Sequence, residues 1–299
     1  MRPSSGGCIS AGITDVHHEG TRVTQTGRMT PTKAAMLGVP YDAGSSYQRG
    51  PAGAPVLIRE ALWSEAGNTW TEAGIDLKDG RLDDEGDLWF TDREPGADAR
   101  ARIEEAVGSI LDSGRRPLLL GGDHSITYPA LRGMRRHHPR LGILHLDAHP
   151  DLYHEFQGDP YSHACPFARI MDEQLADRLV QVGIRTMTGH QREQADKFGV
   201  EVIDMRTWRD GMPLRFDTPV YLSLDLDAID PGLAPGVSHR EPGGLTVRQA
   251  LGIIQSLEAP LAGADLVEFN PLNDSSGLSA AVSAKLVKEI AARMLMETR

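Results

Sequence analysis

Short apolar runs alternate with longer helix-like patterns along most of the chain. This alternation is typical of a largely parallel β-sheet covered by helices. It predicts an α/β fold, a three-layer α-β-α sandwich with a mainly parallel central sheet. Strands are expected at residues 34–39, 117–120, 141–146, 179–182, 200–203, 220–224 and 262–269. Helices are expected at residues 54–65, 98–113, 127–138, 165–177, 188–198, 246–257 and 277–296.

The first 32 residues differ in composition from the rest of the chain. They are poor in large apolar residues and rich in Ser, Gly, Thr and charge, without the apolar run of a signal peptide. We expect residues 1–32 to form a flexible tail. Because no repeat or linker follows, residues 33–299 are predicted to form one domain.

Composition and charge limit the kinds of molecule that the chain is expected to bind. The net charge of -11 argues against nucleic acid as the main partner, because phosphate binding needs a basic face. No run reaches the roughly 18 to 20 apolar residues of a membrane-spanning helix. Only two cysteines occur, Cys8 and Cys165, and they lie too far apart in sequence to indicate a disulfide framework. These features predict a soluble, cytoplasmic protein that binds neither membrane nor nucleic acid.

Polar clusters follow four of the predicted strands. In an open α/β sheet, ligands bind beyond the carboxyl ends of the strands, where the loops converge. We therefore expect the four clusters to contribute to one site. They are GGDHS (121–125), DAHPD (147–151), DLDAIDP (225–231) and EFNP (268–271).

Six residues of these clusters have side chains that bind metal ions: His124, Asp147, His149, Asp151, Asp225 and Asp227. In an extended backbone, residues two positions apart face the same side, so the acidic residues of each cluster would point together. So many carboxylates would repel one another unless cations lay between them. Two divalent ions that share carboxylates would use all six side chains, and together they would acidify a water molecule for hydrolysis. The mixed nitrogen and oxygen ligands fit Mn²⁺ best, with Zn²⁺, Co²⁺ and Ni²⁺ as alternatives.

Each motif taken alone also has a structural interpretation. SLDLDAIDP (223–231) could be a solvated turn, although it is a poor calcium loop because Asp230 and Gly236 occupy its sixth and twelfth positions. GGDHS could be a tight turn in which His124 caps a helix. The occurrence of all the clusters at strand ends of one predicted sheet favours the metal interpretation.

GGDHS, DAHPD and SLDLDAIDP, in this order and followed by EFNP, resemble the signature of the ureohydrolase family, which includes arginases and agmatinases. The resemblance extends from about Leu37 to the end of the chain and implies an arginase-like sandwich fold. Two longer segments are similar to plant-type arginases and their bacterial agmatinase-like relatives. They are DAHPDLYHEFQGDPYSHACPFARIM (147–171) and APGVSHREPGGLT (234–246).

The resemblance implies a binuclear centre with two Mn²⁺ per chain, Ni²⁺ being the main alternative. One ion would be held by His124, Asp147, Asp151 and Asp225. The other would be held by Asp147, His149, Asp225 and Asp227. Asp151 would also orient the attacking hydroxide. Asp230 has no ligand role in the family pattern and is expected to close the turn before Pro231.

Catalytic and substrate-binding roles are implied in the same way. His163 would protonate the leaving amine, and its structural alternative is a packed or capping histidine at the start of the next helix. Glu268 would grip the planar guanidinium group. Glu155 could attract a distal ammonium group or could be a solvated loop charge. Tyr47, with Ser45, Ser46 and Arg49, is expected in the pocket wall.

The implied reaction is hydrolysis of a guanidino compound of the agmatine or arginine class to urea and an amine. The loop 152–163 lacks the Asn, Ser and Thr pattern of animal-type arginases, so free guanidine or guanidinobutyrate, hydrolysed with Ni²⁺, is an alternative. A non-catalytic subunit of a mixed assembly and a zinc deacetylase are further alternatives, and the complete ligand set speaks against both. The family implies a homo-oligomer, a trimer or a hexamer.

Overall fold

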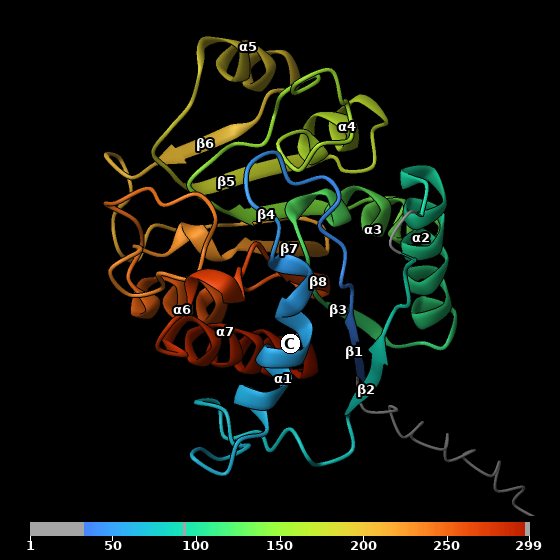
Figure 1. Cartoon of the computed structure of the whole chain (residues 1–299), viewed down its shortest axis with the longest axis vertical. Helices are drawn as coiled ribbons and strands as arrows, with labels where there is room; N and C mark the ends of the chain where they lie inside the picture. Colours follow the sequence, from blue (N-terminus) through green and yellow to red (C-terminus); the bar gives the residue numbers. More distant parts are fainter. Residues whose placement is uncertain (1–32, 92–93, 297–299) are drawn as a thin grey trace, which may run out of the picture. The chain divides into compact units, whose positions relative to one another are not determined.

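A central sheet of eight strands, all parallel to their neighbours, organises the chain (Figure 1). The computed structural model describes residues 33–91 and 94–296, so the predicted tail lies outside the described residues. The strands are β1 (Ala34–Gly38), β2 (Leu82–Asp87), β3 (Arg116–Leu120), β4 (Gly142–Leu146), β5 (Arg178–Ile184), β6 (Glu201–Asp204), β7 (Val220–Asp225) and β8 (Leu261–Val267). Their order in the sheet is β2-β1-β3-β8-β7-β4-β5-β6.

Helices cover both faces of the sheet, which confirms the predicted three-layer sandwich (Figure 1). On one face lie α1 (Ala54–Leu62), α6 (Val247–Ser256) and α7 (Leu278–Leu295). On the other lie α2 (Gly96–Asp112), α3 (Thr127–Met134), α4 (Pro166–Asp172) and α5 (Gly189–Phe198). Among the described residues, no helix has both the length and the apolar character needed to cross a membrane.

The six inner strands of the sheet bury both of their faces, and the core therefore forms two layers. In β3, Leu118 and Leu120 pack on the side of α1 and α7, whereas Leu119 packs on the side of α2 and α3. Burial on both faces explains why these strands read as continuous apolar runs rather than alternating patterns.

One strand was missed by the sequence reasoning. The edge strand β2 has the sequence LDDEGD and is largely exposed, so no apolar periodicity marks it. It pairs with β1 along one side only. Arg59 Nε lies 2.9 Å from Asp84 Oδ2, and Arg115 Nη1 lies 3.1 Å from Asp83 Oδ2. Neighbouring guanidinium groups therefore balance part of the strand's negative charge.

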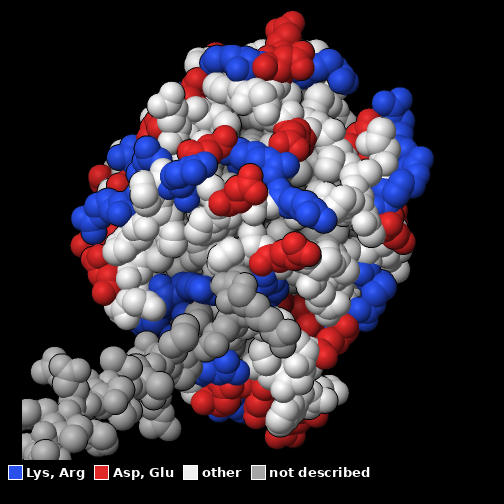
Figure 2. Space-filling view, turned by 180° about the vertical axis from the view of Figure 1, so that it is seen from behind, with Lys and Arg blue, Asp and Glu red and all other residues white. Residues whose placement is uncertain are grey.

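Charged residues of both signs share the surface. On the face seen in Figure 2, Lys and Arg side chains are interspersed with Asp and Glu. Such mixing is typical of a solvated surface rather than of a face that binds phosphate groups.

Candidate metal and catalytic site

The carboxyl ends of four adjacent strands meet at one place. β3, β8, β7 and β4 are neighbours in the sheet, and the four polar clusters follow these strands. His124 begins the turn after β3, Asp147 follows β4, Asp225 ends β7, and Glu268 follows β8. All four side chains are buried. The sheet topology thus brings together residues that lie up to about 140 positions apart in sequence.

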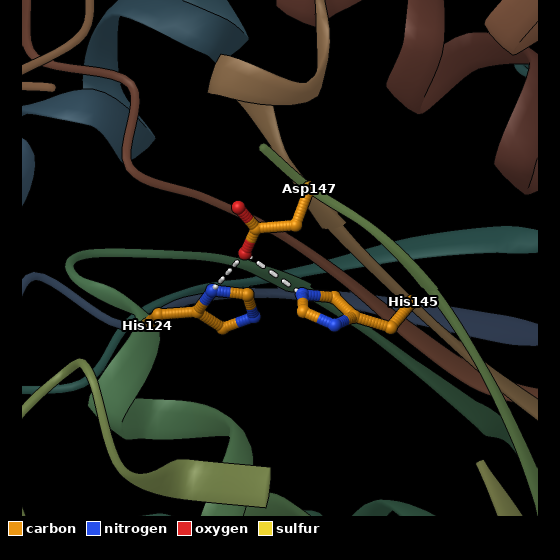
Figure 3. Close-up of side chains that lie close together, drawn as sticks. All are labelled: His124, His145 and Asp147. Atoms are coloured by element: carbon orange, nitrogen blue, oxygen red, sulfur yellow. Dashed lines mark hydrogen bonds and ion pairs between the residues drawn. The ribbon is translucent and has the colours of Figure 1, made fainter. Parts of the chain in front are cut away.

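His124 is the centre of one half of the cluster. Its Nδ1 lies 3.2 Å from Asp147 Oδ2 and 3.1 Å from Asp151 Oδ2. The distance from Nδ1 to Asp225 Oδ2 is 3.3 Å. Figure 3 shows the same Asp147 oxygen between the imidazoles of His124 and His145. Three of the predicted carboxylate ligands therefore converge on one imidazole nitrogen.

His149 forms the other half. Its Nδ1 lies 3.0 Å from Asp227 Oδ2 and 3.4 Å from Asp147 Oδ1. Asp147 therefore contacts both histidines, through different oxygens. The structure brings all six predicted ligand residues into one cluster, and their roles as ligands stay a prediction.

The chemistry of His124 fits a metal ion. Its Nδ1 is buried without a hydrogen-bond partner among the described residues. Its Nε2 lies 2.9 Å from Ser223 Oγ, and that hydroxyl donates to Asp265 Oδ1 at 2.7 Å. Because the serine proton is committed to Asp265, the imidazole proton belongs on Nε2. Nδ1 then presents a lone pair to the carboxylates, an arrangement that calls for a cation.

The need for positive charge also appears in the pKa values. Burial lowers the pKa of His124, but the nearby carboxylates of Asp147, Asp151 and Asp225 outweigh this effect and raise the pKa well above its usual range. Burial raises the pKa of Asp225, and the negative charges of Asp227 and Asp147 raise it further. A bound cation would relieve both effects.

The backbone reaches this arrangement through turns. Asp151 has a φ of 49° and Glu268 a φ of 61°, in the left-handed region that residues other than glycine rarely adopt. Asp227 lies in the short 3-10 turn Leu226–Ala228, where its N–H donates to Asp225 Oδ1 at 2.7 Å. The extended backbone assumed from the sequence is therefore wrong beyond the strand ends, although the side chains still converge.

A row of buried polar residues lies beneath the ligands. Ser223 is in register with Asp265 of β8 and with His145 of β4, which in turn is in register with Gln181 of β5. Gln181 Nε2 donates to His145 Nδ1 at 3.0 Å, so His145 carries its proton on Nε2 and donates to Asp147 Oδ2 at 2.8 Å. With both ring nitrogens engaged, His145 orients a ligand rather than serving as one.

Sequence reasoning missed Asp265, Ser223 and Gln181. The available signal was a single polar residue inside an otherwise apolar strand, because a buried polar group needs a partner. Asp265 illustrates this requirement: its Oδ2 accepts hydrogen bonds from Tyr221 Oη at 2.9 Å and Thr127 Oγ1 at 2.8 Å.

Replacing Ser223 by alanine should weaken Mn²⁺ binding by roughly 10- to 100-fold, the usual effect of losing a residue that orients a metal ligand. The change frees the His124 ring to rotate. Isothermal titration of the apoprotein with Mn²⁺ measures this affinity. Tyr221→Phe is the matched control, since it removes a hydroxyl from Asp265 without touching His124. An equal loss in both variants would contradict the proposed path through Ser223.

His163 and Glu268 form a pair beside the cluster. His163 Nδ1 lies 2.8 Å from Glu268 Oε1, which also accepts the His124 N–H at 2.9 Å. Burial lowers the pKa of His163, but the charge of Glu268 and its hydrogen bond outweigh this and raise the pKa to about 9. No side chain caps α4 at its first residue, Pro166. His163 is therefore directed to the site and does not cap the helix.

A cavity of about 180 Å³ opens beside this pair. Two predicted substrate residues lie apart from it. Glu155 is exposed and is not among the cavity-lining residues. Tyr47 is 69% exposed, and its ring centroid lies 5.7 Å from that of His239, which does line the cavity. The cavity is also lined by the uncharged residues Tyr153, Phe156, Ala164, Thr186, Thr188 and Gln191.

The family of the chain follows from its sequence and fold. The family model described as the arginase family matches residues 32–292, and the chain belongs to this family. It is similar to a mitochondrial arginase of Medicago truncatula, with 47% identity over 279 residues that cover 87% of this chain and 82% of that protein. The solved structure of arginase from Medicago truncatula matches with a TM-score of 0.83 and 44% identity, covering 88% of each chain.

An agmatinase of Bacillus anthracis is also similar, with 31% identity over 268 residues that cover 87% of this chain and 91% of that protein. Together, these findings confirm the ureohydrolase resemblance and the arginase-like fold predicted from the motifs. They also confirm the predicted class of enzyme, a metal-dependent hydrolase of guanidino compounds that releases urea.

The predicted cytoplasmic location is wrong. The Medicago relative is named mitochondrial. An Arabidopsis thaliana relative, 46% identical over 278 residues covering 87% of this chain and 80% of that protein, is named a chloroplastic/mitochondrial arginase. The prediction relied on the presence of only two cysteines, which lie far apart in sequence. Such a low cysteine content indicates a reducing environment, but it does not identify the compartment. It also relied on a missing apolar run, which organelle-targeting segments do not require.

Proposed function

We propose that this chain hydrolyses a guanidino compound of the arginine or agmatine class to urea and an amine, at a site that holds two Mn²⁺ ions. One observation carries the proposal. The Nδ1 of His124, which has no hydrogen-bond partner among the described residues, faces three carboxylates. This cluster lies beside a cavity that is also lined by the His163 and Glu268 pair. The names of the arginase and agmatinase relatives support this substrate class.

The cluster supplies ligands for two ions. His124, Asp151 and Asp225 surround one position, His149 and Asp227 surround the other, and Asp147 contacts both. When bound, the two ions would lower the pKa of a water molecule and thereby supply a nucleophile at neutral pH. The mixed oxygen and nitrogen donors favour Mn²⁺, with Ni²⁺ as the main alternative.

Glu268 and His163 would handle the substrate. Among the described residues, no hydrogen bond reaches Glu268 Oε2, so this oxygen is available to a guanidinium N–H. His163, with a pKa raised to about 9, holds a proton at neutral pH. It can give that proton to the nitrogen that leaves when the C–N bond breaks. The pair thus binds the cationic end of the substrate and supplies the acid.

A smaller guanidine, hydrolysed with Ni²⁺, is the second candidate. Among the described residues that line the cavity, no Lys or Arg occurs, and the carboxylates belong to the proposed metal ligands and to Glu268. Free guanidine has no tail that would need a charged partner there. The carboxylate of guanidinobutyrate would need a cationic partner, so the lack of Lys and Arg in the described lining favours guanidine over guanidinobutyrate.

A substrate panel tests the proposal. Urea release would be measured with arginine, agmatine, guanidinobutyrate, guanidinopropionate and guanidine, after separate loading with Mn²⁺ and Ni²⁺. One strong substrate would establish the reaction and the preferred metal. If no compound of the panel released urea, and if no partner protein restored activity, the proposed function would be contradicted.

We also propose that the chain forms a homo-oligomer, either a trimer or a hexamer. Light scattering would measure the number of chains in the oligomer.

Removing the metal ions should lower the melting temperature by roughly 5 to 10 °C, the effect of losing a ligand present at about 100 times its Kd. The buried carboxylates of the cluster repel one another once the cations are gone. Calorimetry with and without a chelator measures the shift, and added Mn²⁺ should reverse it. The Asp225→Ala variant should show little shift, and a shift as large as wild type would count against the assigned cluster.

A further inference from the structure

Both ring nitrogens of His163 have protein partners. Nδ1 lies 2.8 Å from Glu268 Oε1, and Nε2 lies 2.8 Å from the hydroxyl oxygen of Ser46. Ser46 is half-buried and lines the cavity together with His163 and Glu268. The side of the imidazole opposite the carboxylate is thus covered by a hydroxyl group that faces the cavity.

The loop that carries Ser46 is fixed to the same part of the site. Gly44 O accepts the backbone N–H of His163 at 3.0 Å. The neighbouring Ser45 Oγ donates to the buried Asp123 Oδ2 at 3.1 Å. A Cβ atom on Gly44 would lie 2.7 Å from Ser125 Oγ, so only glycine allows this close approach. Ser46 and His163 therefore keep their relative positions through backbone as well as side-chain contacts.

The hydrogen bonds also fix where the protons lie. The carboxylate of Glu268 can only accept, so His163 Nδ1 carries a proton. In the imidazolium form, Nε2–H donates to Ser46 Oγ. Among the described residues, the Ser46 hydroxyl has no other hydrogen-bond partner, so its own proton is free to point into the cavity. The acid of the site thus reaches the cavity through a hydroxyl group.

We propose that Ser46 relays the proton from His163 to the leaving nitrogen of the substrate, an inference that rests on the proposed function. As the C–N bond breaks, its electron pair stays on the nitrogen and takes the Ser46 hydroxyl proton. The proton on His163 Nε2 moves to Ser46 Oγ in the same step. Ser46 ends as a hydroxyl and His163 as a neutral imidazole, so the step needs no other reactant.

Three variants of the full, metal-loaded chain test the relay. Ser46→Ala should lower kcat by roughly 10- to 100-fold, part of the effect of a general acid, while KM changes little. Ser46→Thr keeps the hydroxyl and should retain most of the activity. Ser256→Ala is the control, because it removes a serine hydroxyl that donates to Ile253 O in α6 and contacts neither His163 nor the loop of Ser46. Its kcat should stay near that of wild type.

Two measurements separate a relay from a merely structural role. The first is kcat measured in mixtures of H₂O and D₂O. Because two protons move in the relay, the kcat of wild type should depend on deuterium content along a curve. In Ser46→Ala this dependence should be linear. Nitrogen-15 NMR should show an exchange-protected Nε2–H on His163 in wild type and Ser46→Thr, and its loss in Ser46→Ala. The NMR readout does not depend on turnover.

Several outcomes would overturn the relay. The relay would be wrong if kcat were unchanged in Ser46→Ala, or if Ser256→Ala or Ser46→Thr lost as much activity as Ser46→Ala. It would also be wrong if the kcat of wild type depended linearly on deuterium content. If wild type released no urea from any compound of the panel, the proposed function would fail first. The NMR spectrum would then still test the contact, since an unprotected His163 Nε2–H in wild type would overturn the geometry on which the relay depends.

Discussion

Replacing Asp225 by alanine should lower urea release by roughly a thousandfold or more, the cost of losing several kcal/mol of metal-supported stabilisation of the transition state. Asp225 is buried, lies 3.3 Å from His124 Nδ1, and accepts the Asp227 N–H. Its loss removes one proposed ligand and releases the turn that holds another. Metal analysis of the purified variant should find fewer than two ions per chain, and kinetics should show the loss in kcat.

Asp230→Asn is the control for this change. Asp230 belongs to the same motif, but its carboxylate accepts the backbone N–H groups of Gly232 at 2.9 Å and Gly243 at 2.7 Å. It therefore closes the turn, as the resemblance to the family implied. Asp230→Asn should cost about 1 kcal/mol of unfolding free energy and leave metal content unchanged. A normal metal content in Asp225→Ala would refute the ligand role of Asp225.

Replacing His163 by alanine should slow turnover by roughly 10² to 10⁴-fold, as is typical when a general acid is lost. The proposed metal ligands stay in place, so two ions should still bind. Glu268 loses its cationic partner but can still pair with the guanidinium group, and KM should therefore change less than kcat. Steady-state kinetics and metal analysis of the same preparation measure all three quantities.

His154→Ala is a suitable control for His163. His154 lies on the same loop but is exposed, and its Nδ1 lies 2.9 Å from an Arg169 nitrogen rather than in the cavity. Its loss should leave kcat near the wild-type value. An unchanged rate in His163→Ala would exclude His163 as the acid, whereas loss of metal from this variant would give it a structural role instead.

The sequence predicted those features that leave a local pattern. Buried parallel strands appear as apolar runs, and the polar residues after Leu120, Leu146 and Leu224 stand out because they interrupt those runs. The sheet rule for ligand sites then placed them together. The six predicted metal-binding side chains needed no further information to be recognised as one cluster.

Other features depend on long-range contacts and leave no local pattern. The acidic strand β2 forms because β1 pairs with it and because Arg59 and Arg115 lie nearby. The link from Ser46 to His163 joins residues 117 positions apart, and a serine in a glycine-rich loop has no feature that reveals it. The partners of Ser223 likewise become visible only once the strand register is known.

The strand order has a consequence for folding during synthesis. β8 lies between β3, which leads to His124, and β7, which leads to Asp225. The ribosome makes β8 after all the other strands, so until it emerges the sheet has a gap between these two proposed ligands. Non-local pairing of this kind completes late in folding. We therefore expect the nascent chain to acquire high metal affinity only after β8 has been translated and inserted.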